Sequence, residues 1–395
     1  MMKGLILNAE AKTASVQAIP IPKLDNGKRQ LLIRIEAIAL NPVDSLYVRN
    51  PIGETGRTVG SDFAGVVVAI SPSQKHLQIG DRIAGLVQGS NSANSRPGAF
   101  AEYLLLQDDD VDLVWKVPSW MTLEDAAGVS LCGLTAAQGA FYRLGIPAPF
   151  SWAGKSSSVA TASAKGEDGT TTVLIYGAST SLGLYAAQLV NLGFGGKRNL
   201  RLIGLASKSK FEMLKKEPYH YTHLLDYHSP DWPSQVREMV GEQGVDYALD
   251  CISEGDTVRN ILSTLGKEPH NKVAIFRSKQ SRAWDSDGID TSKAIYGAVW
   301  EGLGHDIVYG NGMNIRATEE SRNFTVGFYN WLSSGRGKLE PNPIRLMPGG
   351  LERIVPDGFA LLGGGRMEDR DGVRERTEEW MRPVSAEKLV YKISD

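Results

Sequence analysis

The sequence predicts an α/β protein in which a doubly wound parallel sheet follows a mainly antiparallel β domain. From Val173 to about Ile275, short apolar segments alternate with helical ones, which is the pattern of a parallel sheet whose strands are joined by helices. The first third of the chain instead contains strand-like segments rich in Val, Ile and Leu, separated by turn residues. These segments are 30–40, 62–70 and 99–106.

The segments outside these two regions predict a helix, two surface stretches and a final strand. Thr122 with Asp125 offers an N-cap before an Ala-rich helical pattern that runs to residue 141. Residues 150–172 are small and polar, which predicts a surface insertion. Residues 363–380 are dense in mixed charge, which predicts a solvated excursion. The apolar segment 386–393 predicts a final strand that rejoins the first domain.

Charge and cysteine content favour a small-molecule partner and a reducing compartment. The chain of 395 residues carries 43 basic and 45 acidic residues, so it offers no broad electrostatic footprint for nucleic acid or an anionic membrane. It lacks the apolar core of a secretory signal and the roughly 18 apolar residues of a membrane helix. Its cysteines, Cys132 and Cys251, are too far apart in sequence to make a disulfide framework. We therefore expect a cytoplasmic protein.

The stretch "VLIYGASTSLGLYAAQLV", residues 173–190, predicts a phosphate-binding loop. Gly177 supplies a turn after an apolar strand, small residues follow, and Gly183 lets the next helix lie close to the strand. Backbone N–H groups at such a helix N-terminus bind the pyrophosphate of a dinucleotide. A purely structural strand-to-helix turn would have a similar sequence, so that alternative stays open.

The end of the second strand of this unit indicates the kind of dinucleotide. An NAD site usually carries an acidic residue there for the ribose 2′-hydroxyl, whereas this chain has Ser207, Lys208, Ser209 and Lys210. Hydroxyls and ammonium groups suit a 2′-phosphate, because charge-assisted hydrogen bonds to phosphate are strong. The cofactor predicted is NADPH. The alternative is a pair of solvated lysines without a ligand.

Seven segments, taken in order, resemble the zinc-free, quinone-oxidoreductase-like branch of the medium-chain dehydrogenase/reductase superfamily. The resemblance implies a GroES-like substrate domain of residues 1–145 and 330–395, and a Rossmann dinucleotide-binding domain of residues 146–329. The segments that carry it are "NPVDSLYVR" (41–49), "TVGSDFAGVV" (58–67), "IGDRIAGL" (79–86), "GAFAEYLLL" (98–106), "AAGVSLCGLTAA" (126–137), "VLIYGAST" (173–180) and "YALDCIS" (247–253).

A second group of segments resembles the trans-acting enoyl reductases of fungal polyketide synthases and their peptide-synthetase hybrids. It comprises the polar insertion after residue 150, "SKSKF", "LLDY", "YALDCI", "PIRLMPGGLERI" and "AEKLVYKI". This resemblance implies a monomer that transfers hydride from NADPH to an α,β-unsaturated thioester tethered to a synthase. Two alternatives remain: a stand-alone NADPH quinone or alkenal reductase, and a cofactor-binding scaffold without hydride transfer.

The resemblance also bears on metals. Zinc-dependent members of the superfamily bind the metal through two cysteines and a histidine, and here only one of these places holds a thiol, which cannot form a tetrahedral site. The corresponding residues are the loop 41–44, Ser61-Asp62 and Cys132. A rival cluster is "HYTHLLDYH", with His220, His223, Asp226 and His228. On the expected strand its neighbouring side chains would point apart, so no metal is expected.

The resemblance assigns cofactor-binding roles to both domains. The residues expected at the nicotinamide end are Asn41, Pro42, Val43, Asp44, Ala386 and Glu387. Those expected at the pyrophosphate are Gly177, Ser179, Thr180, Ser181 and Leu182. Those expected at the 2′-phosphate are Ser207, Lys208, Ser209 and Lys210, and Tyr227 is expected to pack on the adenosine.

Catalytic and substrate-binding roles follow by the same resemblance. Thr135 is expected near the carboxamide and the substrate carbonyl. Relatives often carry a lysine or tyrosine at the place of Leu46, so Tyr47 is a candidate proton donor, with solvent as the alternative. The expected substrate-pocket residues are Ala136, Ala137, Gln138, Gly139, Ala140, Phe141, Tyr142, Arg143, Gly297, Ala298, Val299, Trp300 and Glu301. For 136–143, core packing is the alternative.

Overall fold

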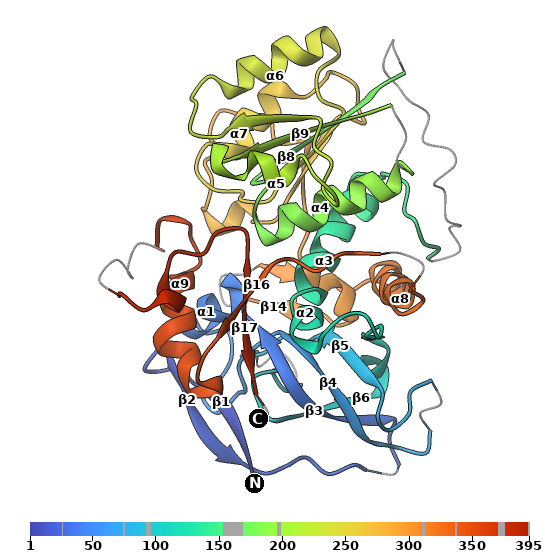
Figure 1. Ribbon diagram of the computed structural model, residues 1–395, viewed down its shortest axis with the longest axis vertical. Coiled ribbons are helices and arrows are strands. Elements are labelled where there is room, and N and C mark those ends of the chain that lie inside the picture. The colour runs from blue at the N-terminus through green and yellow to red at the C-terminus, as the bar shows by residue number, and fades with distance from the viewer. Residues whose placement is uncertain are drawn as a thin grey trace. The chain divides into compact units, whose positions relative to one another are not determined.

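The computed structural model consists of two compact units, through which Figure 1 traces the chain. It describes residues 1–25, 27–73, 76–91, 96–152, 169–195, 199–309, 313–335, 338–369 and 376–393. The first unit contains Met1–Leu131 and Gly302–Asp395, and the second contains Cys132–Glu301. The insertion expected at 150–172 lies largely outside the described residues, since 153–168 are not among them.

The borders of the two units lie earlier in the chain than the expected ones, 145/146 and 329/330. The segment after residue 131 belongs with the second unit, where a Cβ on Gly139 would lie 2.7 Å from the ring of Phe276. Helix α8 (Glu319–Ser333) belongs with the first unit, since Ser333 Oγ accepts a hydrogen bond of 3.0 Å from the backbone N–H of Lys116. Packing of these connecting helices therefore sets the borders.

A mainly antiparallel sheet forms the centre of the first unit, as predicted. Its strands follow the order β16 (Ile344–Met347), β17 (Lys388–Lys392), β3 (Gln30–Ala39), β4 (Asp62–Ile70), β5 (Arg82–Leu86) and β7 (Val114–Lys116), and β6 (Tyr103–Gln107) pairs with β3. Only β16 and β17 run parallel to each other among these pairs. Strands β1 (Met2–Asn8) and β2 (Thr13–Ile19) form a separate antiparallel pair.

The C-terminal strand rejoins this sheet, as expected from its apolar pattern. Strand β17 pairs antiparallel with β3, with Tyr391 opposite Ile38. Both side chains are fully buried, in a core that also contains Ile33, Phe63 and Phe100. The end of the chain is thereby anchored beside the segment that leads into helix α1 (Pro42–Arg49).

Helices and short turns complete the first unit. Thr122 caps α2 (Leu123–Ala127) by accepting a hydrogen bond of 3.1 Å from the N–H of Asp125, which confirms the predicted cap. The helical pattern expected to run to residue 141 is interrupted at Gly128 and resumes as α3 (Ser130–Ala137) and the π-helical segment η2 (Gln138–Arg143). Of these segments, η2 already belongs to the second unit, and η6 (Val299–Leu303) spans the later border. The other elements of the first unit are η1 (Asp108–Asp112), β14 (Ile307–Val308), β15 (Asn314–Ile315), η7 (Gly350–Arg353), η8 (Ile354–Phe359), α9 (Ala360–Leu362) and η10 (Glu379–Met381).

The charged stretch 363–380 is exposed at 366–369, as predicted for a solvated excursion, and 370–375 lie outside the described residues. Its last described residues, 376–380, include contacts to the interior of the unit. Arg376 Nη2 donates a hydrogen bond of 3.1 Å to Asp357, whose side chain is fully buried. Arg353 bonds the same carboxylate, and the indole N–H of Trp380 lies 3.3 Å from it. The excursion folds back because this buried carboxylate needs donors.

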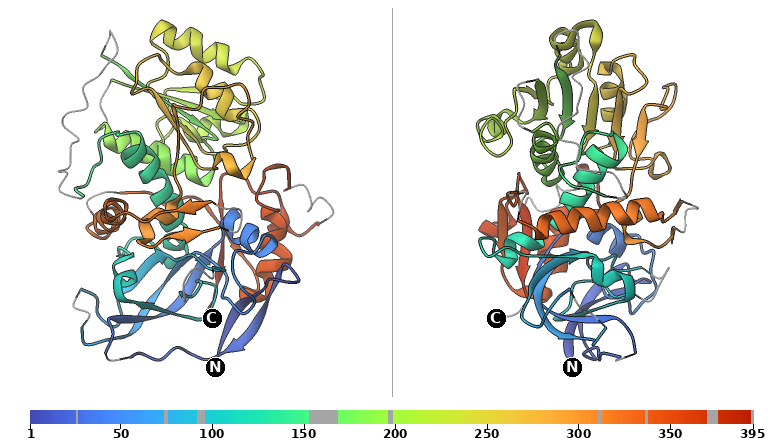
Figure 2. Two further views of the ribbon diagram at one scale, coloured as in Figure 1. Left: turned by 180° about the vertical axis from the view of Figure 1, so that it is seen from behind. Right: turned by 90° about the vertical axis from the view of Figure 1, so that its right-hand side faces the viewer.

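The second unit contains a parallel sheet, which confirms the prediction from alternating apolar and helical segments. The strand order is β10 (His223–Asp226), β9 (Leu200–Ala206), β8 (Thr171–Tyr176), β11 (Tyr247–Asp250), β12 (Lys272–Ile275) and β13 (Ala294–Tyr296). In chain order this is 3-2-1-4-5-6, the doubly wound dinucleotide-binding arrangement. Helices lie on both faces of the sheet (Figure 2). They include α4 (Ser181–Gly193), α5 (Phe211–Leu214), α6 (Trp232–Val240) and α7 (Thr257–Thr264), with η3 (Lys208–Lys210), η4 (Gly241–Gln243) and η5 (Lys279–Ser281).

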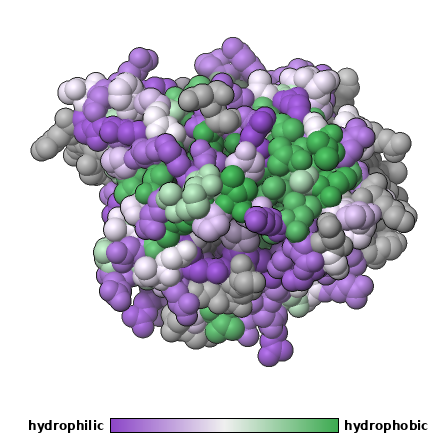
Figure 3. Space-filling view, turned by 90° about the horizontal axis from the view of Figure 1, so that it is seen from below, coloured by the Kyte–Doolittle hydropathy of each residue, from purple (hydrophilic) through white to green (hydrophobic). Residues whose placement is uncertain are grey.

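The surface carries some apolar side chains. A band of hydrophobic residues crosses the face seen from below (Figure 3). Large exposed apolar side chains of the first unit include Ile79, Trp120 and Leu346. Exposed apolar residues are ordinary on globular proteins, because there is too little polar surface to cover them. In the part of the chain that the structure describes, no helix is long and apolar enough to span a membrane.

Candidate active site

Helix α1 places the predicted loop residues at its own N-terminus. Asn41 is the N-cap and Pro42 occupies the first turn, where its fixed φ suits the helix and its missing N–H costs nothing. Asp44 completes the turn, because its carboxylate accepts a 2.8 Å hydrogen bond from the backbone N–H of Asn41. Asn41 and Asp44 are buried, while Pro42 and Val43 are half-buried.

A buried polar cluster surrounds this helix start. It consists of Asn41, Asp44, Ser61, Asp62 and Lys388, and we call it the Asp44–Asp62 cluster. Ser61 Oγ donates to Asp44 at 2.7 Å, and Asn41 Nδ2 donates to Asp62 at 3.0 Å. Lys388 Nζ donates to Asn41 Oδ1 and lies 3.5 Å from Asp62 Oδ2. Each member is at most 3% exposed, so two carboxylates share one ammonium away from water.

Burial controls the protonation of these carboxyls. It raises the pKa of Asp44 to about 7, although the hydrogen bonds from Ser61 and Asn41 act in the opposite direction. Burial also raises the pKa of Asp62, against the lowering effect of the Lys388 ammonium. The N–H of Leu131, at the start of α3, donates to Asp62 at 2.8 Å. The cluster therefore links α1, β4, α3 and β17.

Tyr47 lies one turn after Asp44 on the same helix and is 6% exposed. Its hydroxyl lies 2.7 Å from the hydroxyl of Tyr309, and either oxygen can be the donor. Gln88 Nε2 donates to the Tyr47 oxygen across 3.4 Å, and Asn91 Nδ2 bonds the oxygen of the Gln88 amide. Leu46, at the place where relatives carry a polar residue, is half-buried. Tyr47 thus has a polar environment within the first unit.

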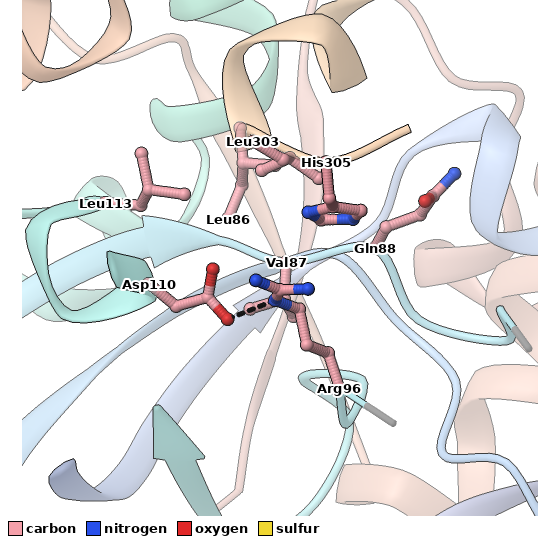
Figure 4. A pocket seen from close by; sticks show the side chains of 8 residues that line it. All are labelled: Leu86, Val87, Gln88, Arg96, Asp110, Leu113, Leu303 and His305. Atoms are coloured by element: carbon pink, nitrogen blue, oxygen red, sulfur yellow. Dashed lines mark hydrogen bonds and ion pairs between the residues drawn. The ribbon is translucent and has the colours of Figure 1, made fainter. Parts of the chain in front are cut away.

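Gln88 also lines a small cavity in the first unit (Figure 4). It has room for about one water molecule, so it is too small for an acyl chain. His305 lies on its wall, where burial lowers the pKa of the imidazole to about 4. Arg96 and Asp110 form an ion pair on the opposite wall. Its full lining is Leu86, Val87, Gln88, Arg96, Asp110, Leu113, Leu303 and His305.

The predicted phosphate loop joins β8 to α4 in the second unit. Gly177 has a φ of +76°, which favours glycine. A Cβ on Gly183 would lie 2.3 Å from the Gly177 carbonyl oxygen, so only glycine permits this close packing of helix and strand. Thr180 caps α4, since its Oγ1 accepts from the N–H of Gly183 at 3.0 Å and donates to the Gly177 carbonyl at 2.8 Å.

The geometry of the loop shows which of the hydrogen-bond donors predicted for the phosphate are engaged within the protein. The hydroxyl of Thr180 is committed to the turn itself, so it contributes shape more than a phosphate contact. The backbone of Ser179, Ser181 and Leu182 forms the helix start, and these residues are half-buried. The loop lies at the carboxyl end of β8, next to the point where the strand order reverses, where doubly wound sheets bind their ligands. The residues present fit a dinucleotide.

The residues expected at the 2′-phosphate follow strand β9 directly. Lys208 and Ser209 are exposed, and Ser207 and Lys210 are half-buried. Asp226, at the end of β10, is an acidic group whose charge interacts with that of Lys208. Its pKa is lowered by hydrogen bonds from His228, with a smaller effect of Lys208. Tyr227 is 42% exposed and stacks on His228, with ring centroids 4.0 Å apart.

The rival metal cluster is not assembled. His228 Nδ1 bonds Asp226 at 2.8 Å, whereas His223 bonds Thr222 at 3.0 Å. Within the described ranges, no three His, Cys, Asp or Glu side chains could together hold a metal ion. Neither Cys132 nor Cys251 forms a disulfide, and burial raises the pKa of the Cys251 thiol.

The two segments expected to line the substrate pocket meet in the second unit. Arg143 forms an ion pair with Glu301, and its guanidinium lies 4.6 Å from the ring centre of Tyr142. Gln138 Nε2 donates to the Val299 carbonyl at 3.4 Å. Residues 136–141 are buried, whereas Thr135, Tyr142 and Arg143 are half-buried. Core packing therefore accounts for much of 136–141.

The C-terminal residues expected at the nicotinamide end have structural bonds of their own. Ala386 has a φ of +58°, and Glu387 is paired with Arg345 and Arg382. Arg345 is itself buried and donates to the carbonyl of Trp380 at 2.9 Å.

The sequence did not single out two residues of the first unit that belong to these polar groups, Lys388 and Tyr309. Each meets its partner only through the fold, so no local pattern could have identified it.

Comparisons with known proteins agree with the fold. Residues 27–119 match the family model for the alcohol dehydrogenase GroES-like domain. An alcohol dehydrogenase superfamily protein from Novosphingobium aromaticivorans is 20% identical, with a TM-score of 0.70 and full coverage of both chains. The CurK enoyl reductase is 17% identical, with a TM-score of 0.68, over 100% of this chain and 99% of that one. These comparisons show that the chain shares its fold, a GroES-like domain and a parallel dinucleotide-type sheet, with solved alcohol dehydrogenases and enoyl reductases.

Proteins similar in sequence identify the family to which the chain belongs. The trans-enoyl reductase thnE of Trichoderma harzianum is 32% identical over 87% of this chain and 88% of its own length. The trans-enoyl reductase FSL5 of Gibberella zeae is 30% identical over 95% of this chain and 93% of its own length. The chain belongs to the trans-enoyl reductase family.

Proposed function

We propose that this chain reduces the α,β double bond of an enoyl thioester carried by a polyketide synthase or a synthase–peptide synthetase hybrid, with NADPH as the cofactor. The observation that carries the proposal is the likeness to trans-enoyl reductases along nearly the whole chain. The dinucleotide loop at the switch point of the parallel sheet supports it. The protein acts as a cytoplasmic monomer in this proposal.

The preference for NADPH rests on the turn after β9. Lys208 is exposed and Lys210 half-buried directly beyond the strand, and two serines lie beside them. When bound, the reduced nicotinamide supplies the hydride. In the proposal the loop 177–182 holds the pyrophosphate, and Tyr227, which is 42% exposed, offers a face to the adenine. Residues 41–44 and 386–387 complete the nicotinamide end.

The reduction asks two things of the side chains. Hydride addition at the β-carbon develops negative charge on the thioester oxygen, and a donor aimed at that oxygen lowers the barrier. We assign this donor role to the Thr135 hydroxyl, which lies on the half-buried face of α3. The α-carbon must then receive a proton, and Tyr47 is the donor. In the proposal, residues 136–143 and 297–301 line the pocket for the acyl chain, with the half-buried Tyr142 and Arg143 offering contact surface and the buried 136–141 supporting them from the core.

Substrate comparison tests the function. Crotonyl-pantetheine, the same acyl group on a carrier protein, crotonic acid and a simple quinone are each offered with NADPH, and products are weighed by mass spectrometry. The thioesters are expected to gain two hydrogens and the carrier-bound one to react fastest, because remote binding energy helps to position the reacting carbon. Faster turnover of the quinone would mean a stand-alone quinone reductase. NADPH binding without oxidation of any substrate would mean a scaffold.

The Thr135 assignment has its own control. Thr135→Val removes the hydroxyl and keeps the side-chain volume, so turnover is expected to fall roughly 10²-fold, as for the loss of an oxyanion donor. Thr135→Ser keeps the hydroxyl and is expected to retain most of the turnover. Equal turnover of the two variants would remove Thr135 from the mechanism.

A further inference from the structure

Two tyrosine hydroxyls, distant in sequence, form one hydrogen-bonded pair in the first unit. Tyr47 comes from α1, Tyr309 directly follows β14, and their oxygens lie 2.7 Å apart. The ring centroids are 6.3 Å apart at an interplanar angle of 50°, so the rings do not stack. The specific contact between the two side chains is therefore the one between their hydroxyl groups.

The direction of this hydrogen bond can reverse. A phenol oxygen donates one hydrogen and accepts others, and the geometry allows either tyrosine to be the donor. When Tyr309 donates to Tyr47, the hydrogen of Tyr47 is available for another acceptor. When Tyr47 donates to Tyr309, the hydrogen of Tyr47 is engaged within the pair and cannot be given to another acceptor. The heavy atoms stay in place in both states, because only hydrogens change position.

A neighbouring amide fixes a second donor on the same oxygen. Asn91 Nδ2 bonds the Gln88 oxygen, so the amide nitrogen of Gln88 is the end that faces Tyr47, at 3.4 Å. Both amide side chains are buried, with exposed fractions of 4% and 2%. Donors that face an oxygen favour its anionic form. Gln88 and Tyr309 together stabilise the negative charge that Tyr47 bears once it has given up its proton.

The two tyrosines differ in exposure. Tyr47 is buried, whereas Tyr309 is half-buried. A proton from water can therefore reach Tyr309 more readily than Tyr47. Tyr47 in turn lies one helical turn after Asp44, in the helix that the superfamily resemblance places at the nicotinamide. The pair thus connects a buried hydroxyl near the expected reaction centre with a hydroxyl closer to solvent.

We propose that Tyr47 and Tyr309 form a two-hydroxyl proton relay, in which Tyr47 protonates the α-carbon and Tyr309 restores the proton of Tyr47. The relay rests on the proposed enoyl reduction. The electron pair of the enolate forms the new C–H bond at the α-carbon, and the O–H bond of Tyr47 breaks and leaves its electrons on oxygen. Tyr47 then takes the proton of Tyr309, which takes one from water. The net change is one solvent proton, which balances the hydride.

Variants that remove one oxygen atom test the relay. Tyr47→Phe is expected to lower turnover of crotonyl-pantetheine roughly 10²-fold, which is typical for loss of a general acid. Tyr309→Phe is expected to lower it about ten-fold, since one donor to Tyr47 is lost. Tyr391→Phe is the matched control, because the side chain of Tyr391 is fully buried and its hydroxyl bonds backbone groups, donating to the Arg353 carbonyl at 3.1 Å and accepting from Gly358. Its turnover is expected to be unchanged.

Deuterium labelling separates a relay from a structural role of Tyr309. In D2O the unmutated protein is expected to place deuterium on one face of the α-carbon, and both relay variants are expected to lose this facial purity and to show a larger solvent isotope effect. Tyr309→His, which keeps a donor, is expected to restore part of the turnover and serves as the second variant if Tyr309→Phe does not fold. The affinity for NADPH should be the same in the unmutated protein and in every variant.

The outcomes distinguish the relay from the function. If the unmutated protein reduces no enoyl thioester, the proposed function fails and the relay fails with it. If it reduces the thioester while Tyr309→Phe matches Tyr391→Phe in turnover, isotope effect and facial purity, only the relay is overturned.

Discussion

Lys388 is expected to be the counterion that keeps the Asp44–Asp62 cluster folded. Its ammonium lies 3.5 Å from Asp62 Oδ2, and the two side chains are 4% and 0% exposed. At an effective dielectric constant of about 20, two unit charges at this separation attract by about 5 kcal/mol. Loss of one partner of a buried pair costs about 3–5 kcal/mol, because the other charge stays buried without compensation. Lys388→Met should therefore lower the free energy of unfolding by about 3–5 kcal/mol.

The loss should depend on pH in a definite direction. Burial already raises the pKa of Asp62, and removal of the ammonium raises it further. An aspartate whose folded pKa exceeds its unfolded value binds its proton more tightly in the folded state, so folding stability falls as pH rises. Urea unfolding of Lys388→Met should therefore show a smaller deficit at pH 5 than at pH 8. Adding Asp62→Asn should recover part of the stability at pH 8.

The matched control lies on the same strand. Lys392 pairs with Glu124 at 2.9 Å, but its side chain is 58% exposed. Exposed pairs contribute about 0–1 kcal/mol, so Lys392→Met should change stability by less than about 1 kcal/mol at either pH. Equal, small and pH-independent effects of the two lysine variants would refute the counterion role of Lys388.

Four further outcomes test the site. The pKa of Asp44 is about 7 in the folded protein, so its contribution to stability should fall as pH rises from about 4 to 7, and Asp44→Asn should remove this slope in urea titrations. Lys208→Ala should weaken NADPH binding about ten-fold and leave NADH binding unchanged; equal affinity for both cofactors in the unmutated protein would exclude a 2′-phosphate site. Gly183→Ala should lower stability by about 1–3 kcal/mol and weaken both cofactors, since its Cβ would lie 2.3 Å from a carbonyl oxygen. Activity should survive prolonged chelation, and stoichiometric zinc by elemental analysis would contradict this.

Local patterns predicted the elements well, because each depends on residues close in sequence. Alternating apolar and helical segments predicted the parallel sheet, and Thr122 predicted its own cap. The length of the helical region was less predictable. Its pattern runs to residue 141, yet helix α2 ends at Gly128, and the chain continues as α3 and then as a π-helical segment from Gln138. Tertiary packing outweighs local propensity here: α2 packs on strands β3 and β4 of the first unit, whereas η2 packs on β12 of the second.

Contacts between distant residues could not be predicted from the same patterns. Lys388 and Asn41 are 347 positions apart, and Tyr47 and Tyr309 are 262 apart. The mixed charge of 363–380 is typical of a solvated segment, yet Arg376 bonds a fully buried carboxylate on η8. Such pairings depend on which strands meet in the sheet, and the hydrophobic period specifies the face of a strand but not its neighbour.

The cluster and the relay share one helix, which connects stability to catalysis. Asp44 holds the first turn of α1 through the N–H of Asn41, and Tyr47 lies on the next turn. Ser61 and Asp62, at a place where the superfamily resemblance leads one to expect a zinc ligand in other members, bond the start of this helix, and Lys388 supplies positive charge from strand β17. A rigid helix start limits the positions available to the Tyr47 hydroxyl, and proton transfer requires an accurately placed donor. The buried charges can therefore be retained for the orientation they impose, even though an apolar core could be equally stable.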